Sequence, residues 1–422
     1  MMSMKKRMTE VCVLGGGAAG LMAAISAAAA GARVLVLERE ERCARKLRIT
    51  GKGRCNVTNN CSVEQMLNNV TGNARFLFSV MNAFPPEQAM AFFEELGVPL
   101  KTERGSRVFP VSDRAEDVVQ ALLRRAAALG VEFLHARAGE ILRGEDGCVC
   151  AVRAGEVQVD CDCVILCTGG LSYPKTGSSG DGYAMAQALG HSVTELRPSL
   201  VPLLSPDEDC AAMQGLSLKN VTLTLKNAKG KAVWSELGEM QFTHFGVTGP
   251  LVLSASAHMG KGGPWSLELD LKPGLDEQKL DARLLRMFAE NQNRDFKNAL
   301  DGLLPRLLEP VIIRRSGIPP ETKVNAITRQ QRAALLDSLK HFPIAVSGTR
   351  PIEEAVITAG GIRLKEVNPG TMASKLVEGL FFAGEILDLD AYTGGYNLQI
   401  AWATGRAAGK SAAAYAEGRR TQ

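Results

Sequence analysis

Short, uniformly apolar runs alternate with glycine-rich turns near both ends of the chain. Residues 11–14 (VCVL) are all apolar, as expected of a buried parallel strand. The segment LMAAISAAAAGA has the small residues of a tightly packed helix, and residues 33–38 (RVLVLE) form a second run that ends on an acid. Similar runs follow at 164–167 (VILC) and 380–383 (LFFA). This pattern predicts an α/β fold with a Rossmann-like βαβ domain assembled from discontinuous parts of the chain.

The middle of the chain has a different pattern. Residues 216–234 alternate apolar and polar positions around the turn AKG, which predicts an antiparallel hairpin, and 264–273 add a strand. Residues 196–209 (LRPSLVPLLSPDED) are proline-rich and are interpreted as a linker. We predict a Rossmann-like domain over 1–195 and 351–422, an inserted small β-barrel-like domain over 196–275 and 341–350, and a helical subdomain over 276–340.

The first turn has the spacing of a dinucleotide-binding loop. Gly15, Gly17 and Gly20 stand in G-x-G-x-x-G register between the first strand and the helix, with Ala18 and Ala19 inside the motif. Gly15 permits the tight turn, Gly17 lets the backbone approach a pyrophosphate, and Gly20 lets the helix pack closely. Glu38 can accept hydrogen bonds from ribose hydroxyls, and an acid there favours NAD or FAD over NADP. A glycine-rich turn without a ligand is the alternative.

Two later segments favour FAD over NAD. The sequence Thr168-Gly169-Gly170 follows one apolar run, and Asp181 opens a helix. Another run ends at Gly384-Glu385, and Gly394-Gly395-Tyr396-Asn397 precedes a last helix of small residues. The N-terminus of that helix can stabilise negative charge on a reduced flavin ring, whereas a nicotinamide cofactor does not need so distant a segment. We therefore expect non-covalent FAD.

A basic cluster lies at residues 42–60 (RCARKLRITGKGRCNVTNN), where six of the first thirteen residues are Arg or Lys. Glycines among basic side chains suit a diphosphate. Recognition of a nucleic acid is the weaker alternative, because no aromatic residues interleave with the charges. Arg42 and Arg45 are expected on a solvated face.

The composition of the chain further limits the classes of protein to which it can belong. The net charge of +4 over 422 residues gives little support for nucleic-acid binding. Ten cysteines include no C-x-x-C pair, so we expect free thiols, no redox dithiol and no metal site. The basic N-terminus and its apolar run resemble a signal peptide, but the run contains four closely spaced glycines and continues into a strand. We expect a soluble, cytoplasmic protein without membrane contact.

Five blocks carry a resemblance to a known family: GGGAAGLMAA, RKLRITGKGRCNVTN, CTGGLSYPKTGSSGDGYAMAQALGH, GEMQFTHFGVTGP and GLFFAGEILDLDAYTGGYNLQIAWATGRAAG. The chain resembles the BaiN/aminoacetone-oxidase family of FAD-dependent oxidoreductases, which is distantly similar to fumarate reductase flavoprotein subunits. The resemblance spans residues 11–409. It implies that the loop after the ribose-binding acid wraps the FAD, and that the inserted domain is arranged as predicted above.

The pattern and the resemblance together give the expected cofactor contacts. Those in the first half of the chain are Gly15, Gly17, Ala18, Ala19, Gly20, Glu38, Arg39, Lys46, Thr50, Gly51, Gly53, Arg54, Cys55 and Asn56. The others are Thr168, Gly169, Gly170, Asp181, Gly384, Glu385, Gly394, Gly395, Tyr396, Asn397 and Leu398.

Candidates for the chemistry itself are fewer. His244, next to Thr243 in a shaped loop, could donate a proton to a substrate reduced by hydride, and a structural histidine is the alternative. Tyr173 is a further catalytic candidate. We expect NAD(P)H to bind transiently and the flavin to reduce an activated C=C bond of a small organic, enone-like substrate. An aminoacetone-type amine oxidase and an RNA-acting flavoprotein remain alternatives.

Overall fold

The computed structural model describes residues 5–260 and 263–421. The chain divides into two compact units, unit 1 with residues 1–199 and 352–422 and unit 2 with residues 200–351. These limits lie within four residues of the predicted insertion points. The predicted helical subdomain shares one hydrophobic core with the strands of unit 2, so contacts do not separate it. The three-domain division therefore stays a prediction.

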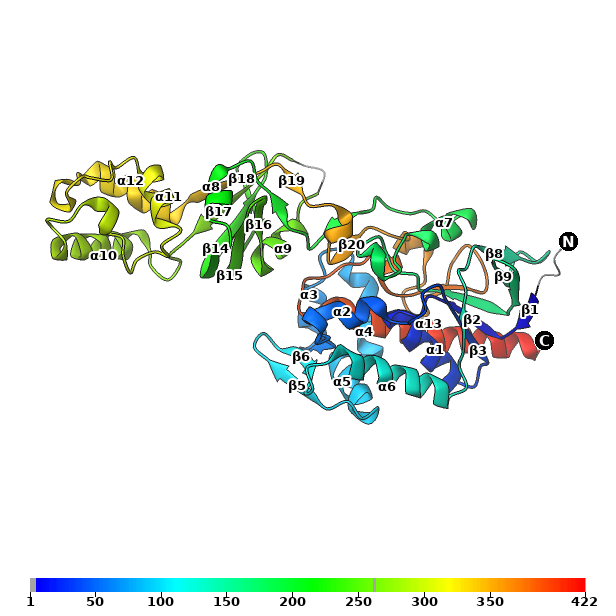
Figure 1. The fold of residues 1–422 in the computed structure, drawn as a ribbon. Helices are drawn as coiled ribbons and strands as arrows, with labels where there is room; N and C mark the ends of the chain where they lie inside the picture. Colours follow the sequence, from blue (N-terminus) through cyan, green and yellow to red (C-terminus); the bar gives the residue numbers. More distant parts are fainter. Residues whose placement is uncertain (1–4, 261–262, 422) are drawn as a thin grey trace. The chain divides into compact units, whose positions relative to one another are not determined.

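Unit 1 is built on a five-stranded parallel sheet in the order β21-β11-β2-β3-β7. Two of its neighbouring strands, β2 and β3, are labelled in Figure 1. Every residue of β2, β11 and β21 is buried, which explains why these strands are continuously apolar in the sequence. The strands are β2 (Val11–Leu14), β3 (Val34–Glu38), β7 (Glu132–His135), β11 (Cys163–Leu166) and β21 (Leu380–Phe382). The Rossmann-like α/β class is confirmed.

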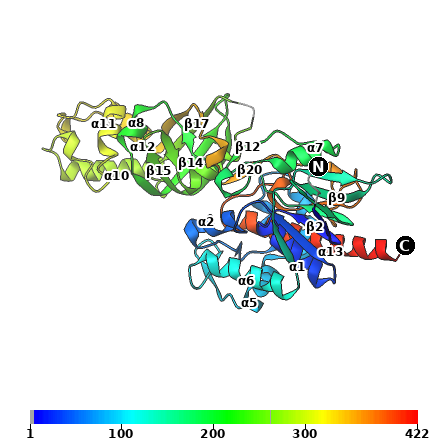
Figure 2. The same cartoon turned by 45° about the vertical axis from the view of Figure 1, so that its right-hand side comes forward.

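The first and last helices of unit 1 lie side by side (Figure 2). They are α1 (Ala18–Ala29) and α13 (Tyr396–Arg420). A Cβ at Gly405 would lie 2.5 Å from the Ala19 carbonyl oxygen, and one at Gly409 would lie 2.2 Å from that of Ala23. The small residues of both helices are therefore required, because the two backbones touch.

Three smaller sheets complete unit 1: β1-β10-β9-β8, β4-β6-β5 and β12-β20. Their strands are β1 (Lys5–Met8), β4 (Thr58–Asn59), β5 (Leu100–Glu103), β6 (Arg107–Pro110), β8 (Glu140–Arg143), β9 (Val149–Ala154), β10 (Val157–Asp160), β12 (Arg197–Ser199) and β20 (Ile357–Ala359). The other α-helices are α2 (Arg45–Gly53), α3 (Val63–Asn68), α4 (Phe78–Ala83), α5 (Pro86–Glu95), α6 (Ala115–Ala128) and α7 (Asp181–Ala188).

Unit 2 contains a seven-stranded sheet in the order β18-β17-β14-β15-β16-β13-β19. Its elements are β13 (Leu203–Leu204), α8 (Glu208–Ala212), β14 (Ser217–Lys226), β15 (Ala232–Thr243), β16 (Gly246–Thr248), α9 (Pro250–Ser256), β17 (Trp265–Asp270), α10 (Glu277–Glu290), α11 (Glu309–Ser316), α12 (Arg329–Lys340), β18 (Phe342–Val346) and β19 (Gly348–Thr349). Only Ser347 joins the two edge strands β18 and β19, so the sheet must curl until its edges meet. This geometry agrees with the predicted barrel-like insertion.

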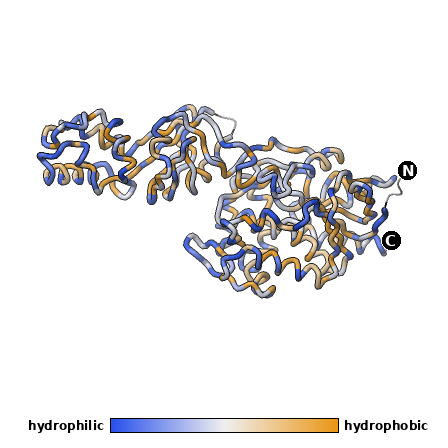
Figure 3. Tube along the Cα trace, viewed as in Figure 1, coloured by the Kyte–Doolittle hydropathy of each residue, from blue (hydrophilic) through white to orange (hydrophobic). Residues whose placement is uncertain are grey.

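Each unit has its own core. Hydrophobic and hydrophilic stretches alternate along the trace of both units (Figure 3), and the buried apolar side chains form two separate clusters. One sequence interpretation was wrong. The supposed linker 196–209 contributes β12 to unit 1 and β13 to unit 2, and α8 begins inside it. Within the described residues no helix is long and apolar enough to cross a membrane; the expected cytoplasmic location stays a prediction.

Candidate functional site: a dinucleotide cavity in unit 1

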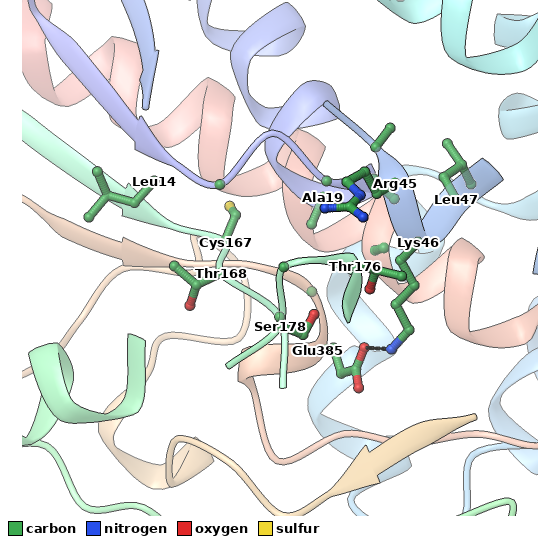
Figure 4. Close-up of a pocket in the computed structure, with 18 of the residues that line it drawn as sticks. Leu14, Ala19, Arg45, Lys46, Leu47, Cys167, Thr168, Thr176, Ser178 and Glu385 are labelled. Carbon is green, nitrogen blue, oxygen red and sulfur yellow. Dashed lines mark hydrogen bonds and ion pairs between the residues drawn. The ribbon is translucent and has the colours of Figure 1, made fainter. Parts of the chain in front are cut away.

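The largest group of predicted site residues meets in one cavity, which residues of unit 1 line entirely (Figure 4). The cavity lies at the carboxyl ends of β2, β3, β11 and β21, and its empty volume is about 1410 Å³ including the space open to solvent. Fifteen predicted residues line it: Gly15, Gly17, Ala18, Ala19, Glu38, Arg39, Lys46, Thr50, Thr168, Gly169, Asp181, Gly384, Glu385, Asn397 and Leu398. Ligands of open α/β sheets bind at this edge.

The glycine loop has the geometry that its spacing predicts. Gly15 has a φ of +101°, and a Cβ there would lie 2.6 Å from the Cys167 carbonyl oxygen. A Cβ at Gly20 would lie 1.8 Å from the Gly15 carbonyl oxygen, so Gly20 serves packing and does not line the cavity. A Cβ at Gly17 would meet no protein atom within 4 Å. No side chain caps the N-terminus of α1, which leaves backbone N–H groups for a phosphate.

Glu38 ends β3 at the cavity wall. Its Oε2 accepts a hydrogen bond from the Gly16 backbone N–H at 2.7 Å, and its Oε1 accepts one from the Glu40 N–H at 2.8 Å. A carboxylate has about four acceptor positions. The backbone therefore orients Glu38 and leaves acceptor capacity for ribose hydroxyls.

A three-residue ion-pair bridge joins distant segments beside Glu38. Arg137 donates to both carboxylate oxygens of Asp181, at 2.8 and 2.9 Å, and Arg39 Nη1 lies 3.2 Å from Asp181 Oδ2. The hydrogen bond from Arg137 lowers the pKa of Asp181 below its ordinary value. All three residues line the cavity, so the bridge keeps one carboxylate ionised among several cationic side chains.

A second ion pair lies on another part of the wall (Figure 4). Lys46 Nζ donates to Glu385 Oε2 and to Ser172 Oγ, both at 2.6 Å, and Ser172 Oγ donates to Glu385 Oε1 at 2.6 Å. The Thr358 backbone N–H also donates to Glu385 Oε1, at 3.0 Å. The side chains of Lys46 and Glu385 are 25% and 12% exposed. This network holds two opposite charges in fixed positions at the cavity.

Thr168 lines the cavity, but its hydroxyl faces the start of α7, where a Cβ at Gly182 would lie 2.0 Å from Thr168 Oγ1. The same atom is buried, and it has no hydrogen-bond partner among the residues that the structure describes. The fit to a ligand therefore depends on the open Gly17, the uncapped α1 and the oriented Glu38, and these residues fit a dinucleotide such as FAD.

The basic loop is placed differently from the expectation. Gly51, Gly53, Arg54, Cys55 and Asn56 are not among the residues that line the cavity. The helix is kinked at residues 50–52, where the backbone leaves helical geometry, and this turns the rest of the segment toward the β5–β6 hairpin. There the Arg54 guanidinium pairs with Glu103 and Asp113 and lies 4.0 Å from the centre of the Phe109 ring. Burial raises the pKa of the Cys55 thiol to about 12, so it stays protonated.

Four other predicted contacts serve packing in this structure. Gly170, Gly394, Gly395 and Tyr396 do not line the cavity. A Cβ at Gly170 would lie 2.4 Å from Thr358 Oγ1, and one at Gly395 would lie 2.3 Å from the Thr58 carbonyl oxygen. These glycines are required because neighbouring segments approach their backbone closely.

The three catalytic candidates are divided between the two units. Tyr173 precedes a short 3-10 turn with a φ of +51°, and Lys46 Nζ lies 5.9 Å from the centre of its ring. Thr243 and His244 belong to unit 2, at the turn between β15 and β16. Thr243 Oγ1 is buried without a partner among the described residues, and His244 is exposed with its ring edge-to-face against Phe245. Their catalytic roles stay predictions.

The sequence interpretation missed several residues of the cavity. Arg42 and Arg45, expected only on a solvated face, are exposed but also line the cavity. Other missed lining residues are Ala136, Arg137, Ala138, Val356, Ile357 and the segment 176–179. The KTGSSGDG stretch, rich in glycine and serine before a helix, was the available signal for 176–179. No local sequence signal identifies residues 136–138 or 356–357 as part of the site. They reach the cavity only because β7 and β20 pair with other strands of unit 1.

The parallel sheet, the glycine loop and the oriented acid define a Rossmann-type dinucleotide-binding protein. Residues 9–411 match the model of the HI0933-like protein Rossmann domain, and the chain belongs to this family. The resemblance to the BaiN/aminoacetone-oxidase family is confirmed by a whole-length relative. The chain is thus an FAD-dependent oxidoreductase.

Three curated relatives extend over almost the whole chain. The 3-dehydro-bile acid delta(4,6)-reductase of Clostridium scindens is 31% identical over 414 residues, which are 96% of this chain and 99% of the relative. The ribosomal RNA dihydrouridine synthase of Escherichia coli is 29% identical, and that of Haemophilus influenzae is 28% identical. Each of these two alignments covers 94% of this chain and 96% of the relative.

Two solved structures are similar in fold. The 3-ketosteroid-delta4-(5alpha)-dehydrogenase of Rhodococcus jostii RHA1 aligns with a TM-score of 0.51 and 18% identity, covering 98% of each chain. The 3-ketosteroid delta1-dehydrogenase of Sterolibacterium denitrificans aligns with a TM-score of 0.51 and 12% identity, covering 97% of this chain and all of that one. At these identities they are evidence for the fold alone.

Proposed function

We propose that this protein is an FAD-dependent reductase of a C=C bond conjugated to a carbonyl group, in a small organic substrate of the steroid-enone kind. The observation that carries the proposal is the whole-length similarity to a bile acid reductase, together with an intact cavity for the cofactor. In such a reduction FAD supplies the hydride, and the protein binds, orients and shields the reactants.

The lining of the cavity supports the following proposed roles for residues of this chain. Gly15, Gly17 and the N-terminus of α1 would bind the pyrophosphate, and Glu38 would bind the adenosine ribose. The Lys46–Glu385 pair would hold the middle of FAD, and the N-terminus of α13 would face its ring system.

Reduction of a conjugated C=C bond requires a proton as well as a hydride. His244, Thr243 and Tyr173 remain the proposed candidates for delivering or positioning that proton. His244 is the strongest on chemical grounds, because an imidazole can both accept and donate a proton and this side chain is exposed.

NAD(P)H is the proposed electron donor. It would bind transiently, because the sequence carries no second G-x-G-x-x-G motif for a separate nicotinamide domain.

The test is an anaerobic titration of the purified yellow protein with NADH and NADPH, followed by addition of steroid enones. Loss of flavin absorbance with a pyridine nucleotide, and its return with an enone, is the expected result. Bleaching by aminoacetone with hydrogen peroxide formed in air would instead select an amine oxidase. None of the three relatives above is an amine oxidase by name.

A second candidate has a specific observation behind it. Two whole-length relatives are ribosomal RNA dihydrouridine synthases, at 28% and 29% identity. The bond that is saturated to form dihydrouridine is also a C=C bond conjugated to a carbonyl, so the same cavity chemistry would serve it. Incubation of unmodified ribosomal RNA with protein and NADPH, followed by mass spectrometry, tests this candidate. A gain of two hydrogen masses on one uridine, without enone turnover, would favour RNA as the substrate.

A further inference from the structure

The first turn of α13 reaches the cavity at Asn397 and Leu398, although Gly395 and Tyr396 do not line it. The residue before the helix, Gly395, has no side chain, and no side chain caps the helix. The first backbone bond of the helix runs from the Gln399 N–H to the Gly395 carbonyl at 3.0 Å. Partial positive charge at this end is therefore available to a ligand.

Buried hydrogen bonds attach this helix end to the chain just after the basic loop. Thr58 Oγ1 donates to Gln399 Oε1 at 2.7 Å, and Asn59 Nδ2 donates to the Gly394 carbonyl oxygen at 3.0 Å. Trp402 Nε1 donates to the Val57 carbonyl oxygen at 2.9 Å. None of these residues lines the cavity.

The same network extends to a third segment of unit 1. Gln399 Nε2 donates to the Phe84 carbonyl oxygen at 2.8 Å. Thr58 and Gln399 have no exposed surface, and Asn59 is 2% exposed. Both ends of the Gln399 amide are therefore satisfied in the interior, as buried polar groups must be to avoid a large desolvation penalty.

Hydrogen bonds at the N-terminus of α13 restrict the position of the helix more than apolar packing would. Apolar contacts tolerate small sliding of a helix along its axis, whereas directional hydrogen bonds lose strength outside a narrow range of distance and angle. The close contact at Gly395 adds a steric limit, because a Cβ there would lie 2.3 Å from the Thr58 carbonyl oxygen. The helix end thus has one defined position along its axis.

We propose that Thr58, Asn59 and Gln399 are positioning residues that hold the N-terminus of α13 at the flavin and thereby set the reduction potential of bound FAD. The inference rests on the proposed function, because it requires FAD in the cavity. Charge stabilisation by a helix end falls off within about one turn. Reduced flavin carries more negative charge than oxidised flavin, so a loosened helix end lowers the potential.

The main test measures the midpoint potential of bound FAD in Thr58→Val and Asn59→Ser, by anaerobic reduction against a redox dye. Thr58→Val keeps the side-chain size and removes the hydroxyl. Asn59→Ser removes the separate bond from Asn59 Nδ2 to the Gly394 carbonyl oxygen, together with its bond to the Gly105 carbonyl oxygen. We expect the equilibrium constant for reduction to fall about tenfold, which is about 30 mV for a two-electron couple. The dissociation constant of sulfite, which forms an anionic adduct with oxidised flavin, should rise by a similar factor.

Two further variants separate positioning from stability. Cys163→Ala removes the weak bond from Cys163 Sγ to the Ala412 carbonyl oxygen, at 3.5 Å, near the other end of α13, and should leave the potential unchanged. Thr58→Ser, which restores a hydroxyl, should return the potential toward that of the parent protein.

The outcomes are distinct. Melting temperatures that fall in Thr58→Val and Asn59→Ser without a change in potential or sulfite affinity would show a merely structural network and overturn the inference. If one of the two variants does not fold, the midpoint potential and sulfite affinity of the other variant decide between the two outcomes. A parent protein that takes up no FAD would reject the proposed function itself, since the flavin signal is recorded before any variant is made.

Discussion

Charged side chains at the cavity find their partners far along the chain. Lys46 meets Glu385, and Asp181 meets Arg39 and Arg137. Each pair joins segments that only the folded parallel sheet brings together. We therefore expect the removal of one of these charges to lower the stability of the folded protein.

Replacement of Lys46 by Met should destabilise the protein by about 1–3 kcal/mol, because it leaves the largely buried Glu385 carboxylate without its cationic partner. Urea unfolding of the FAD-free protein measures this loss. The double variant Lys46→Met/Glu385→Gln should regain much of it. A single variant as stable as the parent would show that solvent already screens the pair.

Replacement of Asp181 by Asn should destabilise the protein by about 0.2–1 kcal/mol, since partly exposed ion pairs contribute this much. The pKa of Asp181 is lowered in the folded protein, so its contribution to the free energy of unfolding is complete above its ordinary pKa and is lost as pH falls through the lowered value. Urea unfolding at neutral and acidic pH should show this loss in the parent and not in the variant. A variant with the same stability and the same pH dependence as the parent would contradict the prediction.

Elements of unit 1 depend on contact between the first and last helices. The backbones of α1 and α13 approach so closely that Gly405 and Gly409 have no space for a Cβ. Since Ala18 and Ala19 of α1 and Asn397 and Leu398 of α13 all line the cavity, this contact positions the beginnings of both helices at the site.

Gly409→Ala should therefore destabilise the protein by about 1–3 kcal/mol, despite the higher helix propensity of Ala, because the new methyl overlaps the Ala23 carbonyl oxygen. Gly418→Ala is the matched control. It lies on the exposed end of the same helix with no atom within 4 Å of the added Cβ, and should be neutral or stabilising by up to about 1 kcal/mol. Equal stability changes in both variants, measured in urea, would reject close contact as the cause.

Elements that depend on local pattern could be predicted from the sequence. The strands β2, β3, β11 and β21 are continuous apolar runs bounded by glycine, and the β14–β15 hairpin alternates around its turn. The strands β12 and β13 were missed because they contain only three and two residues and pair with strands far along the chain. Arg54 was misplaced for the same reason, since its partners Glu103 and Asp113 lie on a hairpin that no local signal connects to it.

At the scale of the whole molecule, all residues that line the cavity belong to unit 1, and unit 2 is a continuous segment with its own core. We expect residues 200–351 alone to fold cooperatively. Thermal unfolding followed by circular dichroism tests this, with heat-denatured protein as the reference. A segment without a cooperative transition would contradict the independence of its core.

A chain that joins residue 199 to residue 352 through a short Gly/Ser linker should still bind FAD, because it keeps the complete cavity. Flavin absorbance after gel filtration measures retention. Glu38→Ala in the same shortened chain is the control that should lose FAD. Complete loss of FAD from the shortened chain itself would mean that unit 2 contributes to cofactor retention.

The pairing of α1 with α13 also determines the order in which the protein can mature on the ribosome. Synthesis proceeds at roughly 5–20 residues per second, and domains form as soon as their segments have emerged. Unit 2 is complete when residue 351 has emerged, whereas the cofactor unit still lacks β21 and α13, which end at residues 382 and 420. The helix α1 is made long before α13, so the face of α1 that contacts Gly405 and Gly409 stays uncovered until α13 has emerged. A nascent chain that stops between residues 351 and 396 would thus contain a finished inserted domain and an incomplete cavity for FAD.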